Sequence, residues 1–175
     1  MRKKIICYIA LAAALLLGLT ACTQELRIDR YELAVRLEKA GKAYSFAPED
    51  VLIEQNKQLI FYSLQQQDDC ILTLVTDKTD RIQTLSVTID RAKWSVEAIQ
   101  SVFVPFSKAV LTAFCANDTI AQKAAEELEL NNANTYISDR LESAAIEKFT
   151  FTVYTNALSN VIACDYGAES VSTTA

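Results

Sequence analysis

Between residues 51 and 90, apolar and polar residues alternate in short runs, and this pattern constrains the fold more than any other feature of the chain. The clearest run is 82–89, where Leu85, Val87 and Ile89 alternate with serine and threonine. Three further runs precede it, at 51–53, 58–65 and 70–76. Short polar segments separate the runs, at 55–57, 66–69 and 77–80. A period of two with brief polar links predicts an antiparallel meander with one wet face.

The pattern becomes helical from residue 92 to residue 146. Apolar residues recur at helical spacing on both sides of Pro105, namely Trp94, Ala98, Ile99, Val102 and Phe103 before it and Phe106, Val110, Ala113 and Phe114 after it. An interior proline removes a hydrogen bond and clashes with the preceding turn. Its neighbours, Val104 and Phe106, are not turn residues. We therefore expect a kink at Pro105 and no loop.

Three other helices are predicted. The first spans residues 29–40, with Asp29 at its start and Gly41 at the C′ position. The second runs through Leu130 from a capping box made by Thr119 and Gln122. A shorter and weaker helix is expected over residues 136–145.

Strands are predicted again at the C-terminus. Residues 149–154 alternate, with Phe149, Phe151 and Val153 on the apolar side, and residues 160–166 form a return strand after a turn at 156–159. The predicted fold class is therefore α+β, an antiparallel β-sheet (a meander plus a C-terminal hairpin) packed against several helices. We expect one domain over residues 29–167 and a frayed tail at 168–175.

The N-terminus carries a different kind of signal. Three basic residues open the chain, an apolar run covers residues 5–17, and Leu19-Thr20-Ala21 stands directly before Cys22. This arrangement resembles the signal peptide and lipobox of bacterial lipoproteins. The resemblance implies removal of residues 1–21, a lipid on the thiol of Cys22 and a short tether over residues 22–28. An uncleaved membrane helix and an ordinary secretory signal are the alternatives.

The resemblance also implies a location and a membrane partner. The domain would face outside the cytoplasm on the cell membrane or outer membrane, held by the Cys22 lipid. Of 17 basic residues, three lie in the removed segment, which leaves 14 basic against 22 acidic residues and a net charge of −8. An acidic domain without a basic stripe repels phosphate backbones, so nucleic acid is not expected as a partner.

The residue inventory excludes several chemistries. The chain has no histidine, which removes Ser-His-Asp and Cys-His catalysis and histidine-ligated metal sites. Only Gly41 and Gly167 remain after residue 21, too few for a phosphate-binding loop. Carboxylates in the predicted turns, at Asp68, Asp69, Asp77 and Asp80, lack the spacing of a calcium loop and are read as turn formers. We predict no catalytic residues, no metal site and no cofactor.

The remaining cysteines leave one question open. Cys70 and Cys164 both lie in strand-like segments and could form one disulfide. The simpler alternative is that they and Cys115 are three buried apolar side chains.

Aromatic residues give the one hint of a ligand site. Tyr44, Phe46, Tyr62 and Trp94, with Phe61, come from a connection, the sheet and a helix start, and they could line an apolar cleft. The predicted function is a lipid-anchored, non-catalytic binding or interaction domain of the cell envelope, whose partner is an envelope protein or a small ligand. The alternative is a carboxylate-dependent hydrolase such as a glycosidase, which needs two carboxyl groups facing across a cleft.

Overall fold

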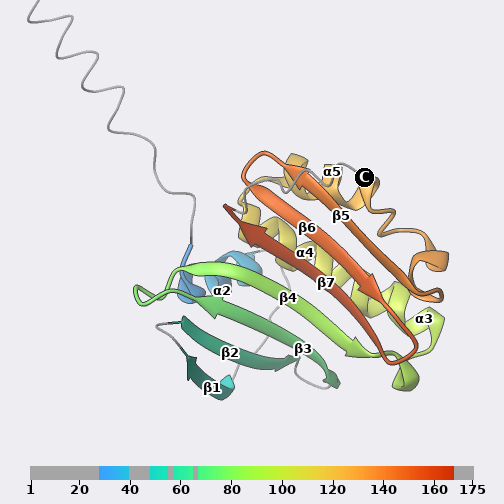
Figure 1. Ribbon diagram of the computed structural model, residues 1–175, viewed down its shortest axis with the longest axis horizontal. Helices are drawn as coiled ribbons and strands as arrows, with labels where there is room; N and C mark the ends of the chain where they lie inside the picture. The colour runs from blue at the N-terminus through green and yellow to red at the C-terminus, as the bar shows by residue number, and fades with distance from the viewer. Residues whose placement is uncertain (1–27, 40–47, 55–56, 65–66, 168–175) are drawn as a thin grey trace, which may run out of the picture.

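The chain folds as one antiparallel sheet with its helices on one side. The computed structural model describes residues 28–39, 48–54, 57–64 and 67–167, with side chains for 28–39 and 70–167. Seven strands are hydrogen-bonded in the order β1-β2-β3-β4-β7-β6-β5, with every neighbour antiparallel (Figure 1). Their bounds are β1 Pro48–Glu54, β2 Lys57–Leu64, β3 Gln67–Thr76, β4 Ile82–Asp90, β5 Arg140–Ile146, β6 Phe149–Thr155 and β7 Ser159–Tyr166. The predicted α+β class is confirmed.

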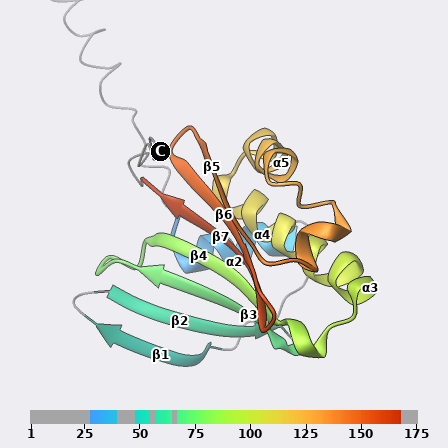
Figure 2. The same ribbon diagram turned by 45° about the vertical axis from the view of Figure 1, so that its right-hand side comes forward.

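The helices cover one face of this sheet, as the turned view in Figure 2 shows. They are α2 Arg30–Lys39, α3 Val96–Ala98, a π-helical turn Ile99–Phe103, α4 Val104–Cys115 and α5 Asp118–Glu127, with short 3₁₀ turns at Arg91–Lys93 and Ala133–Tyr136. The segment from α3 to α5 joins the four-stranded meander to the C-terminal three-stranded one. Strand β7 then returns beside β4 and closes the two meanders into one sheet.

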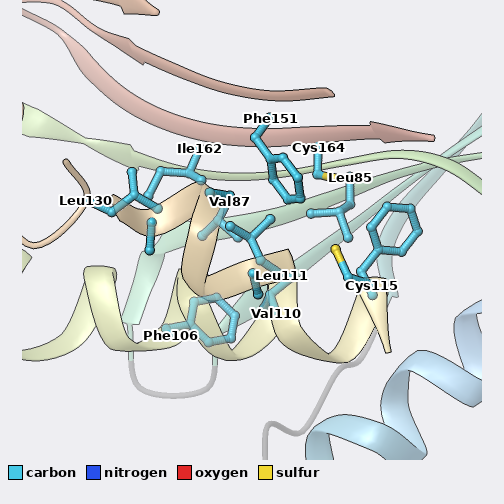
Figure 3. Packing of buried hydrophobic residues seen from close by; sticks show 14 of the residues in the cluster. Leu85, Val87, Phe106, Val110, Leu111, Cys115, Leu130, Phe151, Ile162 and Cys164 are labelled. Carbon is cyan, nitrogen blue, oxygen red and sulfur yellow. The ribbon is translucent and has the colours of Figure 1, made fainter. Parts of the chain in front are cut away.

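The core lies between the sheet and the helices. One cross-strand row consists of Leu74, Leu85, Cys164, Phe151 and Ala144, all buried. Figure 3 shows members of this row packed over residues of α4. The predicted inward face of residues 82–89 is confirmed, because Leu85, Val87 and Ile89 are fully buried.

One row on the opposite face of the sheet carries small and hydroxylated residues. The row beside the core row consists of Thr73, Ser86, Ala163, Thr152 and Ser143, none of which is buried. The hydroxyls of Ser143 and Thr152 lie 2.9 Å apart. This face matches the predicted wet side of an antiparallel sheet.

Pro105 lies inside a continuous helical segment, as the absence of flanking turn residues predicted. No loop interrupts residues 96–115; a π-helical turn directly precedes α4 instead, and the Val104 amide donates to the carbonyl of Ile99. The wider turn accommodates a residue that cannot donate a backbone hydrogen bond. The predicted first helix is also confirmed, since the Glu32 amide donates to the Asp29 carboxylate at 2.8 Å, while Gly41 lies outside the described residues.

Three local predictions are wrong. The second helix is capped by Asn117, whose side chain accepts hydrogen bonds from the amides of Thr119 and Ile120, so the proposed box of Thr119 and Gln122 is not formed. The helix expected over residues 136–145 is largely strand β5, because pairing with the apolar strand β6 outweighs the helix preference of an alanine-rich segment. The turn expected at residues 66–69 is also shorter, since β3 begins at Gln67.

Candidate functional site

The aromatic cleft predicted from the sequence is not assembled by the described residues. Cys22, Tyr44 and Phe46 lie outside them, and only the backbone of Tyr62 is described, in β2 opposite Leu72. Trp94 is half-buried, follows the 3₁₀ turn after β4 and packs against the edge of the core. A ligand site formed by the four aromatic residues therefore remains a prediction.

The N-terminal segment is fixed to one end of the sheet. Ile28 is buried, and its carbonyl accepts a 2.9 Å hydrogen bond from the amide of Ile82, the first residue of β4. Asp29 forms a β-bridge with Arg81, and Arg30 makes a 3.0 Å ion pair with Asp80. The chain therefore enters the domain beside the β3–β4 turn, and we call this the tether end.

Large apolar side chains gather at the opposite end. Four of them are exposed, with exposed fractions of 46% for Ile137, 69% for Leu141, 41% for Tyr154 and 74% for Leu158. Leu141 and Tyr154 are cross-strand partners at the ends of β5 and β6, while Leu158 lies in the β6–β7 turn and Ile137 shortly before β5. We call these four residues the distal patch.

One arginine ties the segments of the distal patch together. The amide of Arg91 donates to the carbonyl of Leu158 at 2.9 Å, and its guanidinium donates to the carbonyls of Asn156 at 2.8 Å and of Ile137. The carboxylate of Asp139 lies 4.0 Å from the same guanidinium. Because this one residue bonds to the segment at 137–139 and to the turn at 156–158, Ile137 and Leu158 are held in a fixed arrangement.

A second surface feature lies between the outer sides of α4 and α5. Two hollows of about 280 and 290 Å³ share Lys108 and Asn131 in their walls. The ammonium of Lys108 donates to the side-chain oxygen of Asn131 at 3.2 Å. Val104, Pro105 and Leu130 give one hollow its apolar wall.

The two carboxylates that line these hollows do not face each other across a cleft as a glycosidase pair would. Asp118 and Glu126 line the same hollow, but both belong to α5 and are eight positions apart, which separates their backbones by roughly 12 Å along one helix. Glu126 also accepts a 3.0 Å hydrogen bond from Gln122. Asp77 acts as the turn former that the sequence suggested, accepting from the amides of Thr79 and Arg81. Asp68 and Asp69 belong to strand β3 instead of a turn.

No group of three or more Asp, Glu or Cys side chains among the described residues is arranged to hold a metal ion. The helical run Val96–Cys115 is long and apolar enough to span a membrane by composition, yet here it packs Phe103, Phe106 and Phe114 against the sheet. No protein-family model, curated protein or solved structure matches the chain.

The distal patch was not found from the sequence. The sequence pattern predicts a helix that includes Ile137 and Leu141, and a turn that includes Leu158. An apolar residue inside the polar turn 156–159 was the one available signal, because leucine is not a turn-forming residue.

Proposed function

We propose that the protein is a lipid-anchored, non-catalytic interaction domain of the cell envelope, which binds an envelope protein through the distal patch. The observation that carries the proposal is the position of the patch, at the end of the sheet opposite the point where the tether enters. The anchor itself rests on the lipobox that ends at Cys22.

The tether and the sheet differ in length. From Cys22 to Ile28 the chain can span at most about 20 Å, whereas the nine residues of β4 alone extend roughly 30 Å. A lipid on Cys22 therefore keeps the β3–β4 turn near the membrane and lets the domain present its other end outward. This geometry favours a protein partner for the distal patch over the lipid surface.

The composition of the patch suits a protein interface. Leucine and tyrosine side chains supply most of its exposed area, and the buried core of an interface is more apolar than the rest of the surface and is enriched in tyrosine. Arg91 holds the backbone at Ile137 and Leu158 in place, so little conformational entropy is lost there on binding. The partner should offer an apolar, weakly charged surface.

Site-specific photo-crosslinking in the organism's own cells tests this function. A photoreactive residue at Leu141 or Leu158 should give one crosslinked product of defined mass. The same residue at Tyr31 is the matched control, because Tyr31 is also exposed but belongs to α2, which begins beside the tether end. Leu158→Asp should abolish the product formed from position 141.

Two outcomes would overturn the proposal. One is the absence of any product from positions 141 and 158 in cells that contain the anchored protein. The other is a product of the same mass and yield from position 31, which would show that crosslinking reports proximity alone. Circular dichroism of the Leu158→Asp protein checks that the charge has not unfolded it.

A further inference from the structure

Two of the three described cysteines meet in the core. Cys115 is the last residue of α4, and Cys164 faces inward from β7; both are buried. The two thiols are near enough for Cys115 to raise the pKa of Cys164. Figure 3 shows the side chain of Cys115 directed from α4 toward the sheet strands that carry Leu85 and Cys164.

Neighbouring ring contacts hold the end of α4 in this place. Phe114 packs edge-on against Phe149 of β6 at 5.7 Å, and Phe149 packs against Tyr166 of β7 at 5.4 Å. Phe151, next to Cys164 in the core row, also contacts Phe149 at 6.0 Å. The approach of the two thiols is thus fixed by the packing around them.

The pairing considered from the sequence, Cys70 with Cys164, is excluded by the register. Cys70 is opposite Ile89 in β4, whereas Cys164 is opposite Leu85. The two cysteines are separated by one intervening strand and by four residues along it, or roughly 16 Å. Bridged cysteines have Cα atoms within about 7 Å.

We propose that Cys115 and Cys164 form a disulfide when the protein folds outside the cytoplasm, while Cys70 stays a thiol. This inference rests on the proposed export of the domain, because disulfides persist in oxidising compartments. The oxidant is another disulfide, of a protein or of a small thiol. The two thiols lose two protons and two electrons, one S–S bond forms, and the oxidant's S–S bond is reduced to two thiols.

The bond must form before the core closes. Burial raises the pKa of the Cys164 thiol well above its ordinary value, and the neighbouring Cys115 thiol raises it further. Exchange requires a thiolate with access to the oxidant, and neither is provided once both thiols are buried. A folded, reduced protein should therefore oxidise slowly, whereas a chain that refolds with an oxidant should acquire the bond.

The expected bond has a structural consequence. It would close a loop of about 50 residues that contains α5, β5 and β6 and would fix the end of α4 to the sheet. Closing a loop of that size removes freedom from the unfolded chain, and the melting temperature should rise by roughly 5–15 °C relative to the reduced protein.

The first test is peptide mapping of the full chain, extracted from the envelope after acid quenching and alkylated in denaturant. The expected result is alkylation of Cys70 and a linked pair of peptides containing Cys115 and Cys164. Alkylation of all three residues would overturn the disulfide in cells. Refolding the full chain in detergent with oxidised glutathione distinguishes the disulfide proposal from the export proposal. A Cys115–Cys164 bond that forms on refolding but not in cells points to a failure of export. If the bond forms in neither case, the proposed disulfide is refuted.

Melting of the oxidised chain, and of the same chain reduced in denaturant and refolded with dithiothreitol, provides the second test. Reduction should lower the melting temperature of the wild-type chain and of Cys70→Ala by the same amount, and should leave the Cys115→Ala/Cys164→Ala variant unchanged. Equal melting of the wild type in both conditions would contradict the proposal. If the double variant does not fold, peptide mapping of the wild type still shows whether the Cys115–Cys164 disulfide is present.

Discussion

The guanidinium of Arg36 in α2 donates a 3.0 Å hydrogen bond to the carbonyl of Ala113, in the last turn of α4. Carbonyls in the last turn of a helix have no partner within the helix, and a basic side chain near them is favoured by the helix dipole. Arg36, 77 positions earlier in the chain, thus gives this carbonyl of α4 a hydrogen-bond donor and fixes α2 beside α4.

Replacing this side chain should destabilise the domain. Arg36→Met keeps the apolar stem but removes the donor, and we expect a loss of about 1–2 kcal/mol in the free energy of unfolding, measured by urea denaturation. Glu32→Gln is the matched control, because it removes only the exposed ion pair of Arg36 with Glu32, worth about 0–1 kcal/mol. Equal losses in the two variants would show that the bond to Ala113 contributes nothing.

The two faces of β6 should respond differently to truncation. Phe151 is fully buried, whereas the next residue, Thr152, is only half-buried on the wet face. Phe151→Ala should cost roughly 3–5 kcal/mol and Thr152→Ala about 0.5 kcal/mol. Chemical denaturation measures both, and similar losses would contradict the register of the strand.

The start of α5 offers a test of the corrected cap. The side-chain oxygen of Asn117 accepts from the amides of Thr119 at 2.9 Å and Ile120 at 3.4 Å, so Asn117→Ala should cost about 1 kcal/mol. Thr119→Ala should cost much less, because Thr119 is an exposed residue inside the helix. If thermal melting gave the reverse order, the capping box predicted from the sequence would be the better description.

Most of the sheet could be predicted because its strands bury one face. Alternation in β4 and β6 sets both the strand type and its inward residues, since a shift by one position would expose every apolar side chain. Strand β5 shows the limit of this reasoning. Its residues Ala144 and Ala145 favour a helix on their own, and only the neighbouring strand β6 decides their conformation.

The distal patch depends on contacts that no local pattern records. Ile137 and Leu158 belong to two segments, and they lie near each other because Arg91, at least 46 positions away from each, bonds to the backbone of both. The same holds for the two thiols, since Cys115 and Cys164 are brought near each other by the packing of α4 on the sheet. The predicted lipobox differs, because it rests on consecutive residues and needs no fold.

The anchor itself can be tested by one substitution. Cys22→Ala removes the thiol that would carry the lipid, so the variant should lose incorporation of a fatty-acid analogue and leave the membrane fraction. Its melting temperature should match that of the detergent-extracted wild type, because neither the hydrogen bond from Ile82 to Ile28 nor helix α2 uses the Cys22 thiol. Cys7→Ala is the control, since Cys7 lies in the apolar part of the signal and should not affect labelling. Undiminished label on Cys22→Ala would refute the lipoprotein assignment, and loss of label in both variants would show that the signal, and not the thiol, had been damaged.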